Sequence, residues 1–223
     1  ATCVTGLTLF DTWTQWSGFG QIVILTLIEI GGLGFMSAAS IFVFVLHRRV
    51  GMKQRLVMAQ SLSVEDMSSV VDLQKVVLKG SLSIQAIGAA ILFLRFWPEV
   101  GLRKALHWGV FHSISAFCNA GFDIMGCIDP GTSVMGYNTD YVVCLTLMAL
   151  VVLGGLGFFV WEEVVRVRCF KKLSVYTKLV LIITLSLLLF GTVSFAILEW
   201  DNPATLGGMS WHHKLLNAAF QSV

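Results

Sequence analysis

Long apolar runs separated by basic stretches are the feature that most constrains this chain. The runs cover residues 17–46, 76–97, 141–165 and 175–200. Each approaches or exceeds the roughly 20 residues with which a helix crosses a bilayer. The chain is 56% hydrophobic and 13% charged, unlike a soluble domain, and it lacks the alternating ten-residue pattern of a membrane barrel. These observations predict an all-α membrane protein.

Basic residues set the expected orientation. The stretch between the first two runs carries Arg48, Arg49, Lys53, Arg55, Lys75 and Lys79, and the stretch before the last run carries Arg166, Arg168, Lys171, Lys172 and Lys178. By the positive-inside rule, both are expected in the cytoplasm, whereas residues 124–140 contain acids but no lysine or arginine and are expected outside. A capping box at Ser63–Asp66 predicts an amphipathic helix, either on the inner membrane surface or docking a cytosolic subunit.

One apolar stretch is too short to cross. A helix from Lys104 to Cys118 would extend only about 21 Å, less than the hydrocarbon core of about 30 Å. It ends in a small-residue turn, residues 118–122 (CNAGF), hereafter the second turn. The last carbonyls of a helix carry partial negative charge, and Gly121 permits a positive φ that exposes further carbonyls. Such a turn suits a cation, although most turns of this kind are simple helix caps.

The same elements recur in register. Residues 3–7 (CVTGL), hereafter the first turn, align in sequence with the second turn. The motif GGLGF occurs at both 31–35 and 154–158. The stretch from Trp211 to Phe220 parallels that from Trp108 to Phe117. The order therefore predicts parallel repeats of span, short helix, turn and span around an axis normal to the membrane. We interpret the paired glycines as sites of close packing rather than of loosened helix.

Several polar residues admit two interpretations. Glu29 lies inside a predicted span and is either a structural hydrogen-bonding group or an ion ligand. Asp11 and Asp123 follow the turns, where they either concentrate cations or serve solubility. Arg95 is expected to snorkel, and Pro98 to close the second span. No HExxH pattern is present, so the histidines near the short helices are expected to pack rather than bind metal: His107, His112, His212 and His213.

Other side chains have simpler interpretations. Trp108 and Trp211 are expected to anchor the membrane interface. The cysteines form no CxxC pair and are expected to be free thiols in apolar surroundings: Cys3, Cys118, Cys127, Cys144 and Cys169. The first residues carry no signal peptide, so the chain is expected to be an internal segment of a longer protein.

These motifs resemble the Trk/Ktr/HKT superfamily of potassium transporters, most closely its bacterial membrane subunit of Ktr or TrkH type. The resemblance is carried by Cys3–Leu7, Ile30–Phe35, Ser115–Asp123 and Ala218–Val223. It implies four units of span, pore helix, filter and span, arranged pseudo-fourfold around one pore. It divides the chain into the end of repeat 1 (1–47), a cytoplasmic linker with the amphipathic helix (48–75), repeat 2 (76–165), a second linker (166–174) and the start of repeat 3 (175–223).

The resemblance also implies a site. Gly6 and Gly121 become filter glycines, and the ion-facing carbonyls become those of Val4, Thr5, Leu7, Asn119, Ala120 and Phe122. Main-chain carbonyls replace the water around a potassium ion without placing a fixed charge in the membrane. In plant members a serine in place of a filter glycine accompanies sodium permeation, so the two glycines favour potassium. The other two filter glycines would lie beyond Val223.

The expected function is potassium uptake across the cell membrane by a multi-pass protein whose filter turns lie near the outside. The resemblance implies a homodimer in membrane lipids with a cytosolic nucleotide-binding (RCK/KTN) regulatory ring, which contacts the loops at 47–79 and 166–178. Potassium would be the bound ion, with no organic cofactor, no nucleic acid and no catalytic residue. Two alternatives are a tandem-pore cation channel, although neither turn reads TVGYG, and an intramembrane enzyme, although no nucleophile–base or zinc motif is present.

Overall fold

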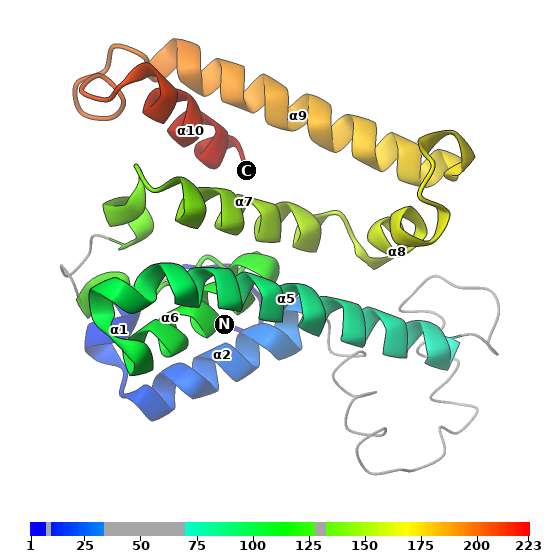
Figure 1. Cartoon of the computed structure of the whole chain (residues 1–223), viewed down its shortest axis with the longest axis horizontal. Coiled ribbons are helices and arrows are strands. Elements are labelled where there is room, and N and C mark those ends of the chain that lie inside the picture. The colour runs from blue at the N-terminus through cyan, green and yellow to red at the C-terminus, as the bar shows by residue number, and fades with distance from the viewer. Residues whose placement is uncertain (8–9, 34–69, 128–132) are drawn as a thin grey trace.

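The computed structural model describes residues 1–7, 10–33, 70–127 and 133–223, and every regular element in these ranges is helical (Figure 1). This confirms the predicted all-helical class for the described residues. The predicted amphipathic helix at Ser63–Asp66 and the end of the first apolar run lie outside these ranges. The elements are α1 (Thr12–Gln15), α2 (Gly18–Gly32), α5 (Val70–Val100), α6 (Leu102–Phe117), η1 (Met125–Cys127), η2 (Ser133–Tyr137), α7 (Tyr141–Gly155), α8 (Phe158–Val167), η3 (Phe170–Lys172), α9 (Val175–Glu199) and α10 (Trp211–Ser222).

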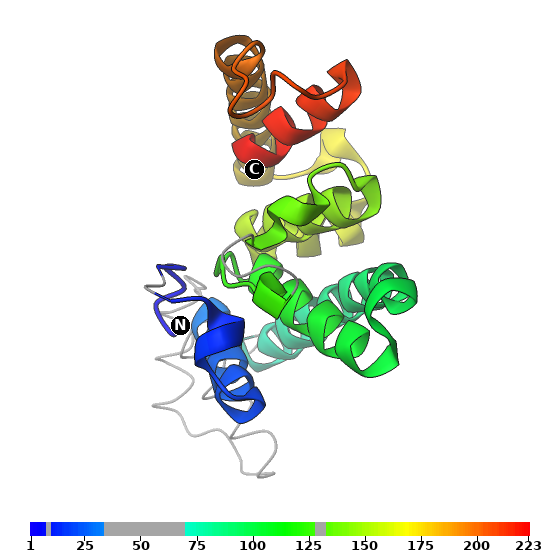
Figure 2. The same ribbon diagram turned by 90° about the vertical axis from the view of Figure 1, so that its left-hand side faces the viewer.

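The helices form successive layers, which can be followed in two perpendicular views. Helix α9 lies with α10 on one side, α7 lies in the middle, and α5, α6 and α2 lie on the other side (Figures 1 and 2). Among the described residues, α5 and α9 are individually long and apolar enough to span a membrane. Helix α5 continues past Pro98 to Val100, so the expectation that this proline closes the helix was wrong by two residues. The fixed φ of proline is compatible with a last helical turn.

The third apolar run is not one straight helix. Helices α7 and α8 meet at an angle of 100°. Between them Gly157 has a φ of 85°, a conformation that side chains disfavour, and it precedes the first residue of α8. The expected single span over 141–165 is therefore replaced by a helix, a sharp bend and a second helix.

Helix α6 is the predicted short helix. Its 16 residues extend roughly 24 Å, and it packs along α5 (Figure 1). Trp108 and Phe111 on α6 are fully buried, as is Phe96 on α5, with the rings of Phe96 and Trp108 edge to face at 5.7 Å. The expected interfacial role of Trp108 was wrong, because its side chain faces α5 rather than the membrane surface. Trp211 is exposed, so its role as an anchor stays a prediction.

The paired glycines let backbone approach backbone. A side-chain carbon on Gly154 would collide with the Phe117 carbonyl at the end of α6, and one on Gly31 would collide with the Thr2 carbonyl before the first turn. A side chain on Gly32 would likewise strike Cys118. Close approach is present at these three glycines, and what approaches is the segment leading into each turn. The alternative of an interrupted helix also holds for the second motif, where α7 ends at Gly155 and the chain bends by 100°.

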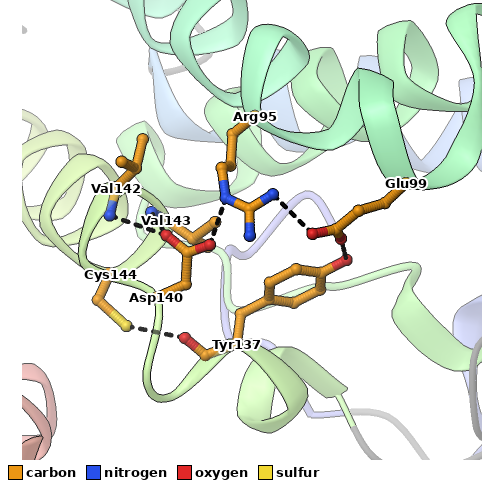
Figure 3. A network of polar contacts seen from close by, with 7 residues as sticks. All are labelled: Arg95, Glu99, Tyr137, Asp140, Val142, Val143 and Cys144. Carbon is orange, nitrogen blue, oxygen red and sulfur yellow. Dashed lines mark hydrogen bonds and ion pairs between the residues drawn. The ribbon is translucent and has the colours of Figure 1, made fainter.

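A polar network joins α5 to the start of α7 (Figure 3). Arg95 is ion-paired through Nη1 to Glu99 Oε1 at 2.6 Å and through Nε to Asp140 Oδ2. Asp140 also caps α7 by accepting from the backbone of Val142 and Val143, at 2.9 and 3.1 Å. Arg95 is thus held by two carboxylates, where the sequence predicted only snorkelling.

Tyr137 completes this network from the loop. Its hydroxyl donates to Glu99 Oε2 at 2.7 Å. Burial, followed by the bond to Glu99, raises the pKa of Tyr137 above its ordinary value, so the hydroxyl remains a donor. The network fixes the external loop between α6 and α7 against the end of α5.

Replacing Arg95 with glutamine is expected to lower the free energy of unfolding by about 1–2 kcal/mol, because Asp140 loses its charged partner. Thermal unfolding of the purified full-length protein in detergent measures this effect. Tyr137→Phe, which removes one hydrogen bond and keeps both ion pairs, should cost less. If the Tyr137→Phe protein is less stable than the Arg95→Gln protein, the ion pairs of Arg95 are not the stronger contacts of the network.

Gly154→Ala is expected to destabilise the protein by about 1–3 kcal/mol, because a methyl group would push against the Phe117 carbonyl. The matched control is Gly18→Ala in α2, where nothing lies within 4 Å of the added carbon and the lower chain entropy of alanine stabilises by about 0.5–1 kcal/mol. Equal stability of the two variants in the same thermal assay would show that the close approach is unimportant.

Candidate functional site

The two turns predicted in separate repeats lie side by side. A carbon added to Gly121 would lie 3.7 Å from the Gly6 Cα, and one added to Gly6 would lie 2.5 Å from the Ala120 carbonyl oxygen. Both glycines have a positive φ, 72° at Gly6 and 70° at Gly121. The structure therefore brings together the two glycines that the sequence singled out.

The backbone of the two turns follows one pattern. Val4 and Asn119, each two residues before the glycine, also have a positive φ, of 50° and 55°. A left-handed conformation costs roughly 1–2 kcal/mol for a residue with a side chain, and it is rare for a β-branched residue. Such strain is typical of functional sites. Thr5 and Ala120 do not share the positive φ.

The carbonyls of these residues lack hydrogen-bond donors. Within the described ranges, no donor bonds to the main-chain oxygens of Val4, Thr5, Gly6, Asn119, Ala120 and Gly121. Ala120 is buried and Val4 and Gly6 are half-buried, where unpaired carbonyls are uncommon, whereas Thr5, Asn119 and Gly121 are exposed. Unpaired carbonyls gathered beside a glycine turn have the chemistry of a site for an alkali cation.

The second turn is anchored to the helix that precedes it. The amide nitrogens of Asn119 and Ala120 donate to the carbonyls of Ala116 and Ser115, at 3.0 and 2.8 Å. The Ser115 hydroxyl donates to the Phe122 carbonyl at 2.6 Å. Phe122 therefore differs from the other predicted carbonyls, because one side of its oxygen is already bonded.

Glu29 of α2 accepts hydrogen bonds from the second turn and from α5. Its Oε2 accepts a hydrogen bond from Gln85 Nε2 of α5 at 3.0 Å and a weaker one from Cys118 Sγ at 3.6 Å. The second oxygen, Oε1, is buried and has no partner among the described residues. This arrangement favours the structural interpretation of Glu29, and it adds Gln85, which sequence reasoning missed because its partner lies on another helix.

The acids after the turns also hold local structure. Asp11 Oδ1 accepts from the backbone of Trp13 at 2.7 Å and so caps α1. Asp123 accepts from the Ser133 hydroxyl at 2.7 Å and from the Met125 amide at 3.1 Å. Their expected effect on local cation concentration stays a prediction.

The four histidines differ in burial: His112 is buried, His107 and His213 are half-buried and His212 is exposed. His112 is buried, with Nδ1 at 2.8 Å from the Trp108 carbonyl, and His107 Nε2 contacts Gln21 Oε1 at 2.8 Å. The rings of His212 and His213 lie 4.5 Å apart. No group of three or more metal-ligating side chains forms among the described residues.

The cysteines divide into two classes. Cys118 and Cys144 are free and buried, as expected, whereas Cys3 and Cys169 are free but exposed. Apolar surroundings stay a prediction for the exposed pair. The side chain of Cys127 lies outside the described residues.

A cavity of about 280 Å³ adjoins the second turn. Asn119 and Gly121 line one side, Val151 of α7 another, and Phe220 and Val223 at the end of α10 a third. The end of the second described short helix, α10, thus lies across a cavity from the second turn.

Comparisons with known proteins identify the family of this chain. The family model for cation transport proteins of TrkH type matches residues 1–223. The chain is 39% identical over 223 residues to potassium/sodium uptake protein NtpJ of Enterococcus hirae and 41% identical over 223 residues to Ktr system potassium uptake protein B of Bacillus subtilis. These matches cover 100% of this chain but 48% and 49% of the relatives, so the chain spans about half their length. The chain belongs to the TrkH family of cation transport proteins.

Proposed function

We propose that this chain forms part of a potassium uptake pathway and supplies two of its filter segments. The observation that carries the proposal is the contact between Gly6 and Gly121 at the ends of chain segments whose carbonyls lack donors. The proposed ion ligands are the main-chain oxygens of Val4, Thr5, Gly6, Leu7, Asn119, Ala120, Gly121 and Phe122.

The physics of dehydration supports this assignment. A potassium ion leaves water only where other oxygens replace its hydration shell, and neutral carbonyls do so without holding the ion too tightly to release it. The C-terminus of α6 adds roughly half an elementary negative charge close to the second turn. Potassium is then the only ligand that the site requires, and transport rather than catalysis is the activity.

The wider architecture belongs to the same proposal. Parallel repeats would surround one pore pseudo-fourfold, with the end of repeat 1 in residues 1–47, repeat 2 in 76–165 and the start of repeat 3 in 175–223. The approach of α10 toward the second turn supports this arrangement. The basic residues flanking α9 lie at its N-terminal end, and the positive-inside rule places that end in the cytoplasm. We propose that the turns lie toward the other side of the cell membrane, facing the outside.

The names of the relatives indicate what accompanies such a subunit. Three of the curated relatives are named as part of a Ktr system for potassium uptake, and one as a potassium/sodium uptake protein. We extend this to a lipid-embedded homodimer of the full-length protein with a cytosolic nucleotide-binding (RCK/KTN) ring. The exposed basic residues of the 166–178 segment are the proposed contact within the described residues.

Serine substitutions at the two glycines test the proposal. In the full-length protein, Gly121→Ser is expected to reduce potassium over sodium selectivity by roughly tenfold while transport persists, because the added carbon has room, with its nearest neighbour at 3.7 Å, but strains a backbone whose φ is 70°. Gly6→Ser is expected to abolish most uptake, because its carbon would press on the Ala120 carbonyl at 2.5 Å. Potassium and sodium uptake into proteoliposomes measures both effects.

Gly101→Ser, just before α6, is the matched control, because its φ of 79° imposes the same backbone strain and nothing lies within 4 Å of a carbon added there. This variant should keep the wild-type ion preference. Unaltered selectivity in Gly121→Ser, together with normal uptake in Gly6→Ser, would rule out a filter at these turns.

A further inference from the structure

The side chain of Asn119 reaches from the second turn into the last turn of α7. With its amide oriented to match its neighbours, the nitrogen donates to the Val151 carbonyl and the oxygen accepts from the Gly155 amide, each at 3.3 Å. An α-helix pairs a residue's N–H with the carbonyl four residues before it. Asn119 therefore bonds an N–H and a C=O that face each other in the last turn of α7, which stays regular through Gly155.

This bridge of two hydrogen bonds lies next to the break in the third apolar run. Helix α7 ends at Gly155, and the chain then bends by 100° into α8. The two hydrogen bonds therefore hold the second turn against the last turn of α7, directly before the bend. A carbon added to Gly155 would lie at an ordinary contact distance of 3.6 Å from Asn119 Nδ2.

The first turn lacks this bridge. Val4 holds the position equivalent to Asn119, with the same left-handed conformation, and lies beside Gly31 of the first GGLGF motif. A valine side chain has no hydrogen-bonding atom. Of the two described turns, only the second is therefore tied through a side chain to the glycine pair behind it.

We infer that Asn119 is a positioning residue that locks the second turn to the bend between α7 and α8 and thereby fixes the spacing of its carbonyls. This inference rests on the proposed filter. Discrimination between potassium and sodium depends on how the coordinating carbonyls are arranged and how firmly they are held. A second turn freed from α7 accommodates the smaller ion more readily, so ion preference falls before transport does.

Asn119→Gly in the full-length protein tests the bridge. Glycine adopts the left-handed conformation without strain, so the variant removes the two hydrogen bonds and keeps the backbone. The ratio of potassium to sodium uptake in proteoliposomes is expected to fall about fivefold, which corresponds to about 1 kcal/mol. Asn138→Gly in the external loop is the matched control and should retain the wild-type ratio.

Hydrogen exchange provides a readout that is independent of transport. Peptides covering residues 151–157 should exchange faster in Asn119→Gly than in wild type, because the Gly155 amide loses its bond to the Asn119 side chain and the last turn of α7 loses its contact with the second turn. Asn119→Asp is the second variant: aspartate keeps the bulk and tolerates the left-handed conformation, but it has no N–H for the Val151 carbonyl. It should also lose selectivity.

The two proposals fail in different ways. Wild-type selectivity and wild-type exchange in a folded Asn119 variant would overturn the positioning role, even where Gly121→Ser changes selectivity. A Gly121→Ser protein with unchanged selectivity would instead remove the filter on which the inference rests.

Discussion

The chain segments that lead into the two turns pack directly against the paired glycines of the GGLGF motifs. This backbone contact determines where the two turns lie. Gly154 admits the carbonyl of Phe117, and Gly31 admits that of Thr2. A methyl group at either position would fill the space that the carbonyl occupies. Because both turns begin within two residues of these contacts, Gly6 and Gly121 come to lie against each other, and the carbonyls between them gather without donors.

This arrangement is strained, and the surrounding structure holds it in place. Four residues of the two turns adopt a positive φ, two of which are not glycine. The fully buried rings of Phe96 and Trp108 fix α6 against α5, and the Arg95 network fixes the loop that follows the second turn. Hydrogen bonds from Ser115 and Asn119 then act on the turn itself. Rigid packing around a strained backbone is what a site of fixed carbonyl geometry requires.

Sequence reasoning predicted the features that depend on local pattern. Helix length, the register of the two turns and the need for close approach at GGLGF all follow from residue type and spacing. It missed the bend at Gly157, because a glycine pair in an apolar run is equally compatible with a straight, closely packed helix. It misplaced Trp108, because the aromatic-belt rule does not tell which face a tryptophan occupies. The partners of Arg95, Glu29 and Asn119 come from other helices, so no local pattern reveals them. The ion ligands themselves stay a prediction from the resemblance.

The most direct measurement is a density map of the full-length protein in a lipid bilayer, recorded in potassium and again with thallium, whose anomalous or scattering signal identifies the ion. We expect density between the first and second turns, coordinated by the main-chain oxygens of residues 4–6 and 119–121. Turns that lie apart in that map, or an ion bound only by side chains elsewhere, would contradict the central claim that these backbone oxygens take the place of water around the ion.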